Sequence, residues 1–352
     1  MNVKKFRPKR ILFYHPFGGI GDVVLVSPTI CALKNSYPEA TIDLMVIPSN
    51  EEIAHYIPNV NQVIVYDHKG RDRNFKQFMK LKAFLHSQRY DLAITTNHST
   101  RNAIVTWISG ARCRIGSPEQ GGFLFLTHPV RKPTQPIHLS QLFLEYIKPL
   151  GITSPDSKLA LNIKAQYLQS VKQKLIVKTK KPIVALCPFG SWPQKSWTIE
   201  QCADLLRKLS PIAELYLIGG KKDRFGLETI NNLSGGIANV LAGELNIGEL
   251  IALIKLSDLV VTVDTGPLHI ASALSIPVVA LYGPTEYYGS GPRGPNDIIV
   301  IHQFECKPCT KEMTCENNRC MQAIQAEEVY IAVQKILTKL KKLITIEKGG
   351  ES

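Results

Sequence analysis

The stretch that decides the fold is LVVTVDTGPLHIASALSIPVVALYGP, residues 259–284. Its first part, 260–263, is a β-branched run typical of a strand that is buried on both faces of a parallel sheet. A short helix is predicted at 268–274 and a second buried strand at 277–281. The stretch therefore predicts a strand–turn–helix–strand unit of an α/β fold.

The turn inside this unit consists of Asp264, Thr265, Gly266 and Pro267. Glycine lets the backbone turn sharply, and proline suits a first helical position, where an N–H would be unpaired anyway. Free N–H groups and the dipole of the following helix favour a phosphate at this end. The polar turn and the nearby His269 are therefore candidate ligand-binding residues. An ordinary βαβ connection without a ligand is the alternative.

Length and charge bound the rest of the chain. A chain of 352 residues exceeds one typical hydrophobic core, so two domains are expected. The formal net charge of +13 suits nucleic acid, an anionic membrane surface or a phosphorylated substrate, without choosing among them. No apolar run reaches the length of a membrane span, and the N-terminus leads into a strand without an apolar signal region. A cytoplasmic protein is expected.

Strand and helix patterns alternate in two blocks. The first block predicts strands at 11–14, 42–47, 63–66, 92–95 and 112–115 and helices at 22–36, 74–87 and 100–108. A helical stretch at 137–150 and a polar, lysine-rich segment at 164–181 follow. The second block predicts strands at 183–186 and 215–218 and helices at 199–209, 224–233 and 247–256, before the stretch quoted above. This alternation predicts two doubly wound parallel sheets, joined near 165–181.

Ligands of such folds bind beyond the carboxyl ends of the strands. The loop after the first strand, HPFGGIGD, has bare backbone at Gly18, Gly19 and Gly21 and ends in Asp22. It does not fit GxGxxG, and no acidic residue follows the second strand, so a dinucleotide site is not expected. Asp22 is interpreted either as a helix cap or as a general base in a glycine-lined cleft.

Two loops of the second block carry further candidates. The loop PFGSWPQKSW offers N–H and hydroxyl donors at Gly190 and Ser191 and a positive charge at Lys195, which stands between two tryptophans. A solvated surface lysine is the alternative reading. The loop IGGKKD ends in Asp223, whose carboxylate can accept hydrogen bonds from a ribose.

Four motifs in matching order carry a resemblance to a known family. They are GDVVLVSPTICALKNSYPEATIDL, FGSWPQKSW, LIGGKKD and SDLVVTVDTGPLHIASALSIPVVALYGPT. Over nearly its whole length the chain resembles glycosyltransferase family 9, the ADP-heptose:lipopolysaccharide heptosyltransferases. The resemblance implies the GT-B fold, in which two Rossmann-like doubly wound domains face each other across a cleft. It implies an acceptor-binding domain at 1–175, a nucleotide-sugar-binding domain at 176–325 and, at 326–352, a C-terminal helix that returns to the first domain.

The resemblance also implies site residues. Asp22 resembles the catalytic base, with Gly18, Gly19 and Gly21 on the acceptor-side loop, and Lys195 is the second catalytic candidate. The implied donor-binding residues are Gly190, Ser191, Lys195, Asp223, Asp264, Thr265, Gly266, Pro267 and His269. The run HPFGGIGD differs from the more polar run ending in LGD of many relatives, which leaves the acceptor open.

The residue types agree with an inverting sugar transfer. Asp22 would take the acceptor proton, while Lys195 and the helix N-terminus at Pro267 would stabilise the leaving diphosphate. No Asp-x-Asp pair is present, so no cofactor is expected for catalysis. The implied partners are ADP-heptose, a lipopolysaccharide core acceptor and the inner face of the cytoplasmic membrane, as a peripheral protein. Nucleic acid is not expected, because the chain has no interleaved basic and aromatic pattern and no helix-turn-helix pattern.

Eight cysteines fall into two kinds. Cys31, Cys113, Cys187 and Cys202 are scattered and are expected in the core. The others follow the pattern C-x2-C-x5-C-x4-C, as Cys306, Cys309, Cys315 and Cys320. This group is interpreted as a structural zinc or iron site that pins the loop before the last helix. Loop disulfides and free thiols are the alternatives.

Three other functions are alternatives to heptosyl transfer. A transferase of the same family with another nucleotide-sugar or acceptor is the nearest, because a few contacts decide the donor. A GT-B sugar-nucleotide epimerase would need further acid–base residues and would turn over without an acceptor. A non-catalytic nucleotide or nucleic-acid binder is suggested by charge alone. Titration calorimetry with ADP, UDP and GDP separates the donor classes.

Overall fold

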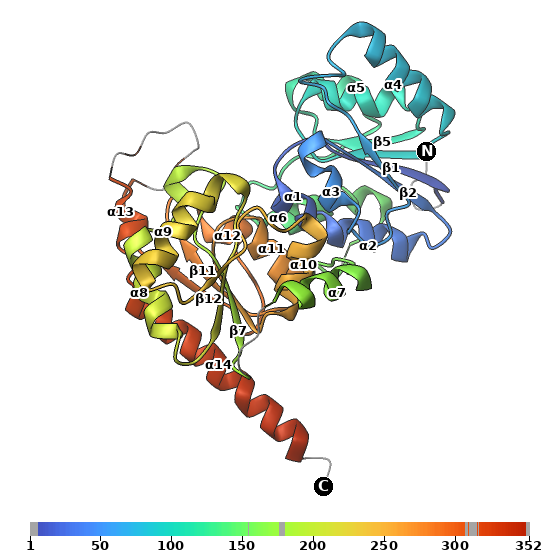
Figure 1. Cartoon of the computed structure of the whole chain (residues 1–352). Coiled ribbons are helices and arrows are strands. Elements are labelled where there is room, and N and C mark those ends of the chain that lie inside the picture. Colours follow the sequence, from blue (N-terminus) through green and yellow to red (C-terminus); the bar gives the residue numbers. More distant parts are fainter. Residues whose placement is uncertain are drawn as a thin grey trace. The chain divides into compact units, whose positions relative to one another are not determined.

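The computed structural model describes residues 6–153, 155–175, 180–306, 309, 315 and 317–349. The chain divides into two compact units, Met1–Asn162 and Ile163–Ser352. Each unit contains one six-stranded sheet whose paired strands are all parallel, with helices packed against it (Figure 1). The two doubly wound sheets predicted from the alternating pattern are therefore present.

The first sheet has the strand order β3-β2-β1-β4-β5-β6. Its strands are β1 (Arg10–His15), β2 (Thr41–Val46), β3 (Gln62–Val65), β4 (Leu92–Thr95), β5 (Cys113–Gly116) and β6 (His128–Pro129). Its helices are α1 (Ile20–Leu25), α2 (Ser27–Ser36), η2 (Pro48–Asn50), α3 (Glu51–Ala54), α4 (Phe75–Ser87), α5 (Thr100–Ile108), η3 (Glu119–Leu124), α6 (Leu139–Glu145) and η4 (Lys148–Leu150). The central strand β1 is fully buried from residue 11 onward, as expected for a strand covered on both faces.

The single helix predicted at 22–36 is two helices. α1 ends at Leu25, and α2 begins at Ser27 with Pro28 in its first turn. Proline has no N–H to continue the ladder of α1 and suits the start of a new helix. The break follows from this one residue.

The second sheet has the strand order β12-β11-β10-β7-β8-β9. Its strands are β7 (Ile183–Cys187), β8 (Glu214–Leu217), β9 (Asn239–Val240), β10 (Leu259–Val263), β11 (Val278–Tyr282) and β12 (Ile298–Ile301). Its helices are α7 (Ala165–Lys174), η5 (Pro193–Lys195), α8 (Ile199–Leu209), η6 (Lys221–Asp223), α9 (Arg224–Ser234), α10 (Ile247–Leu256), α11 (Gly266–Ala273), α12 (Tyr287–Ser290), α13 (Arg319–Gln322) and α14 (Ala326–Gly349).

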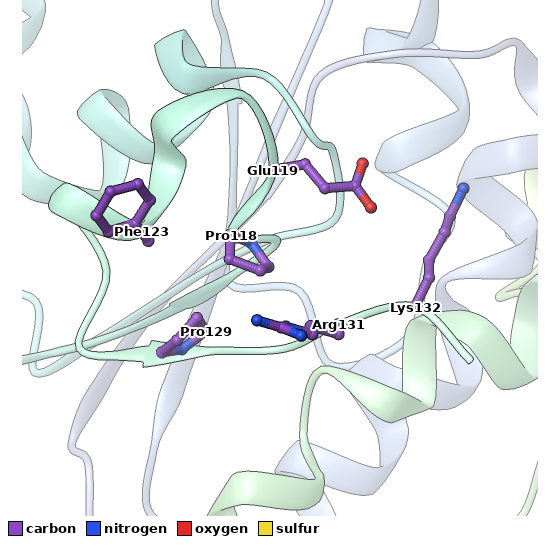
Figure 2. A pocket seen from close by; sticks show the side chains of 6 residues that line it. All are labelled: Pro118, Glu119, Phe123, Pro129, Arg131 and Lys132. Atoms are coloured by element: carbon purple, nitrogen blue, oxygen red, sulfur yellow. The ribbon is translucent and has the colours of Figure 1, made fainter. Parts of the chain in front are cut away.

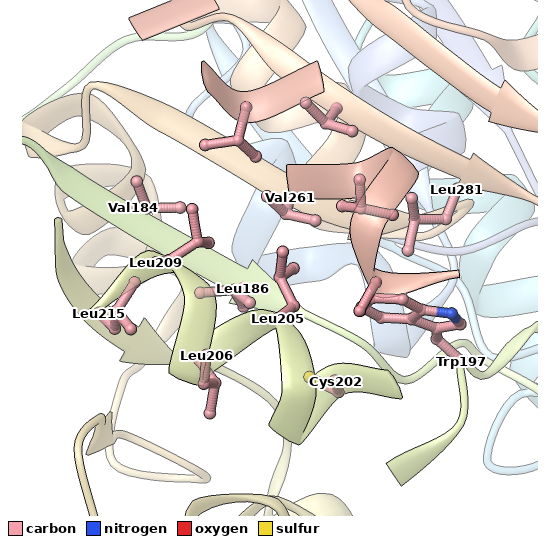
Figure 3. Packing of buried hydrophobic residues seen from close by; sticks show 14 of the residues in the cluster. Val184, Leu186, Trp197, Cys202, Leu205, Leu206, Leu209, Leu215, Val261 and Leu281 are labelled. Carbon is pink, nitrogen blue, oxygen red and sulfur yellow. The ribbon is translucent and has the colours of Figure 1, made fainter. Parts of the chain in front are cut away.

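The core of the second unit lies between its sheet and the helices α8 and α14 (Figure 3). Leu205 and Leu209 of α8 belong to the same buried cluster as Val184 of β7 and Val261 of β10. The Trp197 indole closes one end of this cluster, and its Nε1–H donates to the Ile324 carbonyl at 3.0 Å. The core thus fixes the loop that precedes α8, on which three predicted site residues lie: Gly190, Ser191 and Lys195.

The lysine-rich segment at 164–181 is not simply a connection. Its first part forms α7, which packs against α10 within the second unit. Val171 is buried, and Glu249 of α10 accepts from Lys174 Nζ at 2.7 Å and from Ser170 Oγ at 2.7 Å. The unit boundary at Asn162 therefore precedes α7, instead of following residue 175.

The last helix, α14, packs on α8 and on strands β10, β11 and β12 of its own unit. Its return to the first domain stays a prediction. In the part of the chain that the structure describes, no helix combines the length and apolar character needed to cross a membrane.

Candidate functional site

The Asp264 carboxylate, directly after β10, accepts hydrogen bonds from several side chains of the second unit. Asp264 is 7% exposed. Its Oδ2 accepts from Lys195 Nζ at 2.6 Å and from Thr285 Oγ1 at 2.8 Å. Its Oδ1 lies 3.4 Å from the hydroxyl oxygens of Tyr282 and Ser290. Residues 69 positions apart in the sequence, Lys195 and Asp264, thus form a nearly buried ion pair.

The protonation state of Asp264 follows from these contacts. Burial alone raises the pKa of this carboxyl group, but Lys195, His269 and Thr285 together lower the pKa below its ordinary value. Asp264 is therefore a carboxylate near neutral pH. It uses one of the three N–H donors of Lys195, and an ammonium group has two more for another acceptor.

Lys195 is held in place by its own loop. Its Nζ lies 5.4 Å from the ring centre of Trp192, which is itself buried. A Cβ atom on Gly190 would lie 2.4 Å from Lys195 Cβ, so only glycine allows this close approach. The Gly190 N–H, predicted to face a ligand, donates to Ser196 Oγ at 3.2 Å, whereas Ser191 is exposed.

The turn after Asp264 leads into α11 as predicted. Thr265, Gly266 and Pro267 are partly exposed, and His269 is buried one turn further on. The side chain of Thr265, the residue that precedes α11, makes no capping hydrogen bond to the N-terminus of this helix. The backbone N–H of Gly266 and the helix dipole at this end are suited to an anion beside Lys195.

Asp223 closes its own loop. Its Oδ2 accepts from the Gly220 N–H at 2.8 Å, and the residue is partly exposed. A Cβ atom on Gly219 would lie 3.0 Å from Asp223 Cβ, so the loop is tightly wound around this side chain. The predicted contact of Asp223 with a ribose stays a prediction.

In the first unit, the glycine-rich loop after β1 is wound around Asp22. The Asp22 Oδ2 accepts from the Gly19 N–H at 2.8 Å, so the helix-capping interpretation describes a real contact. Gly18 has a φ of +76°, and a Cβ atom there would lie 2.3 Å from Asp22 Cγ. Gly21 is buried in the first turn of α1. Gly18 is required both by its backbone conformation and by the closeness of Asp22.

Two buried polar residues that the sequence patterns did not single out, His15 and Asn50, support this loop. His15, the last residue of β1, is fully buried, and its Nδ1 lies 2.9 Å from Thr96 Oγ1. Burial lowers the pKa of His15 to about 3, so its imidazole is neutral. Its ring packs against Phe17, with centres 4.4 Å apart, and edge-on against Phe143 at 5.4 Å.

The other missed supports are hydrogen-bonding side chains that follow strand ends. Asn50 is fully buried after β2, and its Nδ2–H donates to the carbonyls of Phe17 at 3.3 Å and Gly18 at 3.4 Å. Thr285 plays the matching part for Asp264, three residues after β11. Position just beyond a parallel strand is the signal that could have found both.

A second feature of the first unit is an open pocket of about 660 Å³ beyond β5 and β6, shown in Figure 2. Its lining is Pro118, Glu119, Phe123, Pro129, Arg131 and Lys132. Glu119 Oε2 lies 3.2 Å from Nδ1 of His98, which follows β4. Burial and the nearby Lys132 lower the pKa of His98, with Glu119 acting in the opposite direction. Arg131 and Lys132 thus border a pocket at the carboxyl ends of the strands, the same end of the sheet that carries the Asp22 loop.

All eight cysteines are free thiols. Cys113, Cys187 and Cys202 are buried as expected, whereas Cys31, which was also expected in the core, is partly exposed. Each member of the C-terminal group contributes to one pocket of about 260 Å³. Its lining is Cys306, Cys309, Cys315 and Cys320 with Gln194, Pro284, Asn317, Asn318 and Arg319. The Cys309 N–H donates to the Pro284 carbonyl at 2.8 Å, and the Asn318 N–H donates to Cys315 Sγ at 3.3 Å. Within the described ranges, no three His, Cys, Asp or Glu side chains are already grouped to hold a metal ion.

Comparison with known families assigns the chain. The model of glycosyltransferase family 9 (heptosyltransferase) matches residues 78–320, more than half of the chain. The chain belongs to glycosyltransferase family 9. It is thus a glycosyltransferase enzyme, as the sequence resemblance implied. Residues 78–320 contain η5 with Lys195, η6 with Asp223 and the turn at Asp264, whereas Asp22 lies before them.

Relatives of the family 9 chain are similar over most of its length. It is 25% identical to lipopolysaccharide heptosyltransferase 3 of Escherichia coli over 327 residues, which cover 90% of this chain and 95% of the relative. It is 27% identical to lipopolysaccharide heptosyltransferase 2 of Escherichia coli over 281 residues, which cover 76% of this chain and 80% of the relative.

Solved structures share the fold. A family 9 glycosyltransferase from Veillonella parvula superposes with a TM-score of 0.84 at 22% identity, covering 96% of this chain and 99% of that one. Escherichia coli ADP-heptose lipopolysaccharide heptosyltransferase II gives 0.76 at 19% identity, covering 94% and 99%. The iron-containing dodecameric glycosyltransferase TibC of enterotoxigenic Escherichia coli gives 0.60 at 14% identity, covering 96% and 78%. The two parallel six-stranded sheets with their flanking helices are the GT-B fold.

Proposed function

We propose that this family 9 enzyme transfers a heptosyl group from ADP-heptose to a lipopolysaccharide core acceptor, with inversion at the anomeric carbon. The observation that carries the donor side is the Lys195–Asp264 pair beside the N-terminus of α11. A fixed cation and a helix N-terminus at one place suit a diphosphate. The names of the heptosyltransferase relatives support heptose as the sugar and the lipopolysaccharide core as the acceptor.

The transfer is one displacement. The acceptor hydroxyl oxygen forms the new bond to the anomeric carbon while the bond from that carbon to the diphosphate oxygen breaks. The electron pair of the broken bond stays on the ADP oxygen. Asp22 takes the proton of the acceptor hydroxyl, and its carboxylate has a second oxygen for this proton beside the one that accepts from Gly19.

The leaving group gains negative charge as the bond breaks. Lys195 and the first N–H of α11 would stabilise that charge, which is usually the largest contribution to such catalysis. Asp264 acts on Lys195 and is therefore a positioning residue: it fixes the ammonium group with the help of Thr285. Asp223 and Ser191 are proposed to contact the ribose and the diphosphate of the donor.

The acceptor side is proposed for the first unit. The pocket with Arg131 and Lys132 lies beyond carboxyl ends of the sheet whose central strand carries the Asp22 loop. Two cations there suit the phosphate or carboxylate groups of a core sugar. A lipid-linked acceptor would place the enzyme at the inner face of the cytoplasmic membrane, as a peripheral protein.

Calorimetry and a transfer assay test this function. We expect ADP to bind more tightly than UDP or GDP, and ADP-heptose to be consumed only when a core oligosaccharide is present. The product linkage, read by nuclear magnetic resonance, should have the anomeric configuration opposite to that of the donor. Tighter binding of UDP or GDP would assign another donor, and turnover without an acceptor would identify an epimerase.

We also propose that the C-terminal cysteines hold one structural zinc or iron ion. Four thiolates are the preferred donor set of both metals, and here all four line one small pocket. Among the described residues the sulfurs are not grouped closely enough to hold a metal ion, so the ion would draw them together and link Cys309 to Cys320 of α13. Iron in TibC supports a metal in this fold. The ion takes no part in the transfer; its pocket shares Gln194 and Pro284 with the loops of Lys195 and Thr285.

A further inference from the structure

Helix α4 of the first unit carries apolar side chains both on the side that packs on the core and on its exposed surface. Its inner side packs Phe78 and Leu81 against the core of the unit and buries Leu85 completely. On its outer side, Phe75 is 77% exposed and Met79 is 41% exposed. One side of the helix thus packs on the core of the unit. Phe75 and Met79 do not belong to that core cluster.

The exposed apolar side chains of α4 are arranged in a regular pattern. Phe75, Met79 and the exposed Ala83 follow each other at four-residue steps, which turn by only about 40° each, so they form one stripe along the helix. The exposed Lys76, Lys80 and Lys82 lie on either side of this stripe. No acidic residue occurs in α4, and no ion pair between described residues involves these three lysines.

We propose that this side of α4 binds the surface of an anionic lipid membrane, with the helix axis parallel to the surface. Phe75 and Met79 would enter the headgroup–acyl boundary, and the three lysines would contact lipid phosphates. An apolar stripe bordered by lysines is the pattern of helices that lie in a membrane interface. Each lysine near such a surface adds to the attraction.

Charge decides against a second copy of this chain as the occupant. Pairing two copies of α4 through this side would bring two sets of three lysines together, without a described carboxylate between them. A negatively charged layer meets both the lysines and the apolar stripe. Figure 1 shows α4 on the surface of the first unit beside α5, with its outer side uncovered by other elements of that unit.

The inference deepens the proposed function, since it would bring the acceptor-binding unit to a lipid-linked acceptor. Its test needs no donor or acceptor, so it fails or succeeds separately from heptosyl transfer. The full-length protein is sedimented with vesicles of phosphatidylglycerol and phosphatidylethanolamine, and in parallel with vesicles of phosphatidylcholine. We expect binding to the anionic vesicles and little binding to the neutral ones. Salt at about 0.5 M, well above physiological ionic strength, should weaken the binding to the anionic vesicles.

Three variants locate the contact. The triple variant with Lys76, Lys80 and Lys82 replaced by Gln should bind anionic vesicles about 10²-fold more weakly. Phe75→Glu should bind at least about tenfold more weakly, because the apolar anchor is lost and a negative charge is added. The matched control is Phe225→Glu in α9 of the second unit, where Phe225 is 82% exposed, and it should bind like the wild type.

All these positions are exposed, so thermal unfolding followed by circular dichroism should be unchanged in each variant. Equal binding to neutral and anionic vesicles would overturn the proposal, as would wild-type binding by the triple variant and by Phe75→Glu. Loss of a dimer in sedimentation of Phe75→Glu, with no vesicle binding by the wild type, would assign this side of α4 to a second copy instead.

Discussion

Two aspartates stand where a parallel strand gives way to a helix, Asp22 after β1 in the first unit and Asp264 after β10 in the second. The Asp22 side chain is partly exposed, and its carboxylate accepts a backbone N–H from Gly19. The Asp264 side chain is buried and accepts from Lys195 and from Thr285. The strand-to-helix connections of two similar sheets thus hold two carboxylates in opposite surroundings, Asp22 in the first turn of α1 and Asp264 directly after β10.

The surroundings decide what each carboxylate can do. A carboxylate that is buried against an ammonium group and hydroxyl donors stays ionised, and its role is to fix that ammonium group. A carboxylate with an unoccupied oxygen in a glycine-lined loop can receive a proton from a bound hydroxyl group. Both aspartates belong to a connection from a parallel strand to a helix. The partners of each side chain decide whether it can accept a proton or only hold a neighbouring charge in place.

The largest expected effect is on Asp22. Asp22→Asn keeps an oxygen for the Gly19 N–H but removes the basic site, so turnover should fall by about 10²–10⁴-fold. The affinity for ADP and the melting temperature should not change. Steady-state kinetics, calorimetry and thermal unfolding measure the three quantities.

A matched control exists in the second unit. Asp223 accepts from the Gly220 N–H at 2.8 Å, as Asp22 does from Gly19. Asp223→Asn should therefore keep its turnover at saturating donor and change only the donor KM. If both variants lose turnover equally, or if Asp22→Asn stays near normal, Asp22 is a helix cap and not the base.

The next effect concerns the pair on the Asp264 side. Lys195→Ala should lower turnover by about 10²-fold, because the leaving diphosphate loses a positioned cation. It should also weaken ADP binding by about 10–100-fold, the range for a charge-assisted hydrogen bond. Lys255→Ala, at an exposed lysine of α10, is the control and should change neither quantity. Unchanged ADP affinity in Lys195→Ala would make Lys195 a purely structural partner of Asp264.

Much of this arrangement was predictable from local sequence patterns. The buried strands, helices α8 and α10, and the turn at Asp264 follow from β-branched runs, helical periodicity and Gly-Pro chemistry. The helix α7 was missed, because its segment is polar and rich in lysine, and Val171 is the one residue of this helix that is buried. The break between α1 and α2 was missed although Pro28 marks it.

The partners within each site were not predictable, because they depend on strand order. β10 pairs with β7, which brings the Asp264 turn next to the Lys195 loop, 69 residues away in sequence. β1 likewise pairs with β4, which places Thr96 beside His15. A single sequence gives the strands and leaves their order open, so it shows which residues end a strand but not which of them meet.

A pH dependence of stability should separate the two units. The pKa of His15 is lowered by burial to about 3 in the folded chain, from an ordinary value of 6.5. The unfolded state therefore binds the proton first, and stability falls as the pH drops from about 6.5 to about 3, by up to about 1.4 kcal/mol per pH unit. The pKa of Asp264 is also lowered in the folded chain. Its contribution to stability is therefore present at a pH above the ordinary pKa of an aspartate, and it is lost only in stronger acid.

Urea unfolding between pH 7 and pH 4 measures this difference. His15→Gln keeps a polar side chain near Thr96 but cannot be protonated, so its stability should depend less on pH over this range than that of the wild type. Asp264→Asn should be less stable than the wild type at pH 7 and keep the same slope between pH 7 and pH 4. Equal slopes in the wild type and His15→Gln would show that the acid sensitivity arises elsewhere.

Changes in the cysteine group should have the smallest effect on turnover, and this effect should be confined to the second unit, which contains Asp264. Purified protein should carry about one zinc or iron per chain, measured by elemental analysis. Cys309 is hydrogen-bonded through its N–H to Pro284, next to the Thr285 that donates to Asp264. Cys309→Ser should lower the melting temperature by about 5 °C and ADP affinity by a few-fold, since the loop before α13 loses its tie. Cys31→Ser in the first unit is the control and should change neither.

A chelator should reproduce the effect of Cys309→Ser in the wild type, whereas a reductant should not. If the protein contains no metal and all four thiols titrate freely, these residues are ordinary loop cysteines. The position of the Asp264 carboxylate would then depend on its contacts with Lys195 and Thr285 and not on a metal ion.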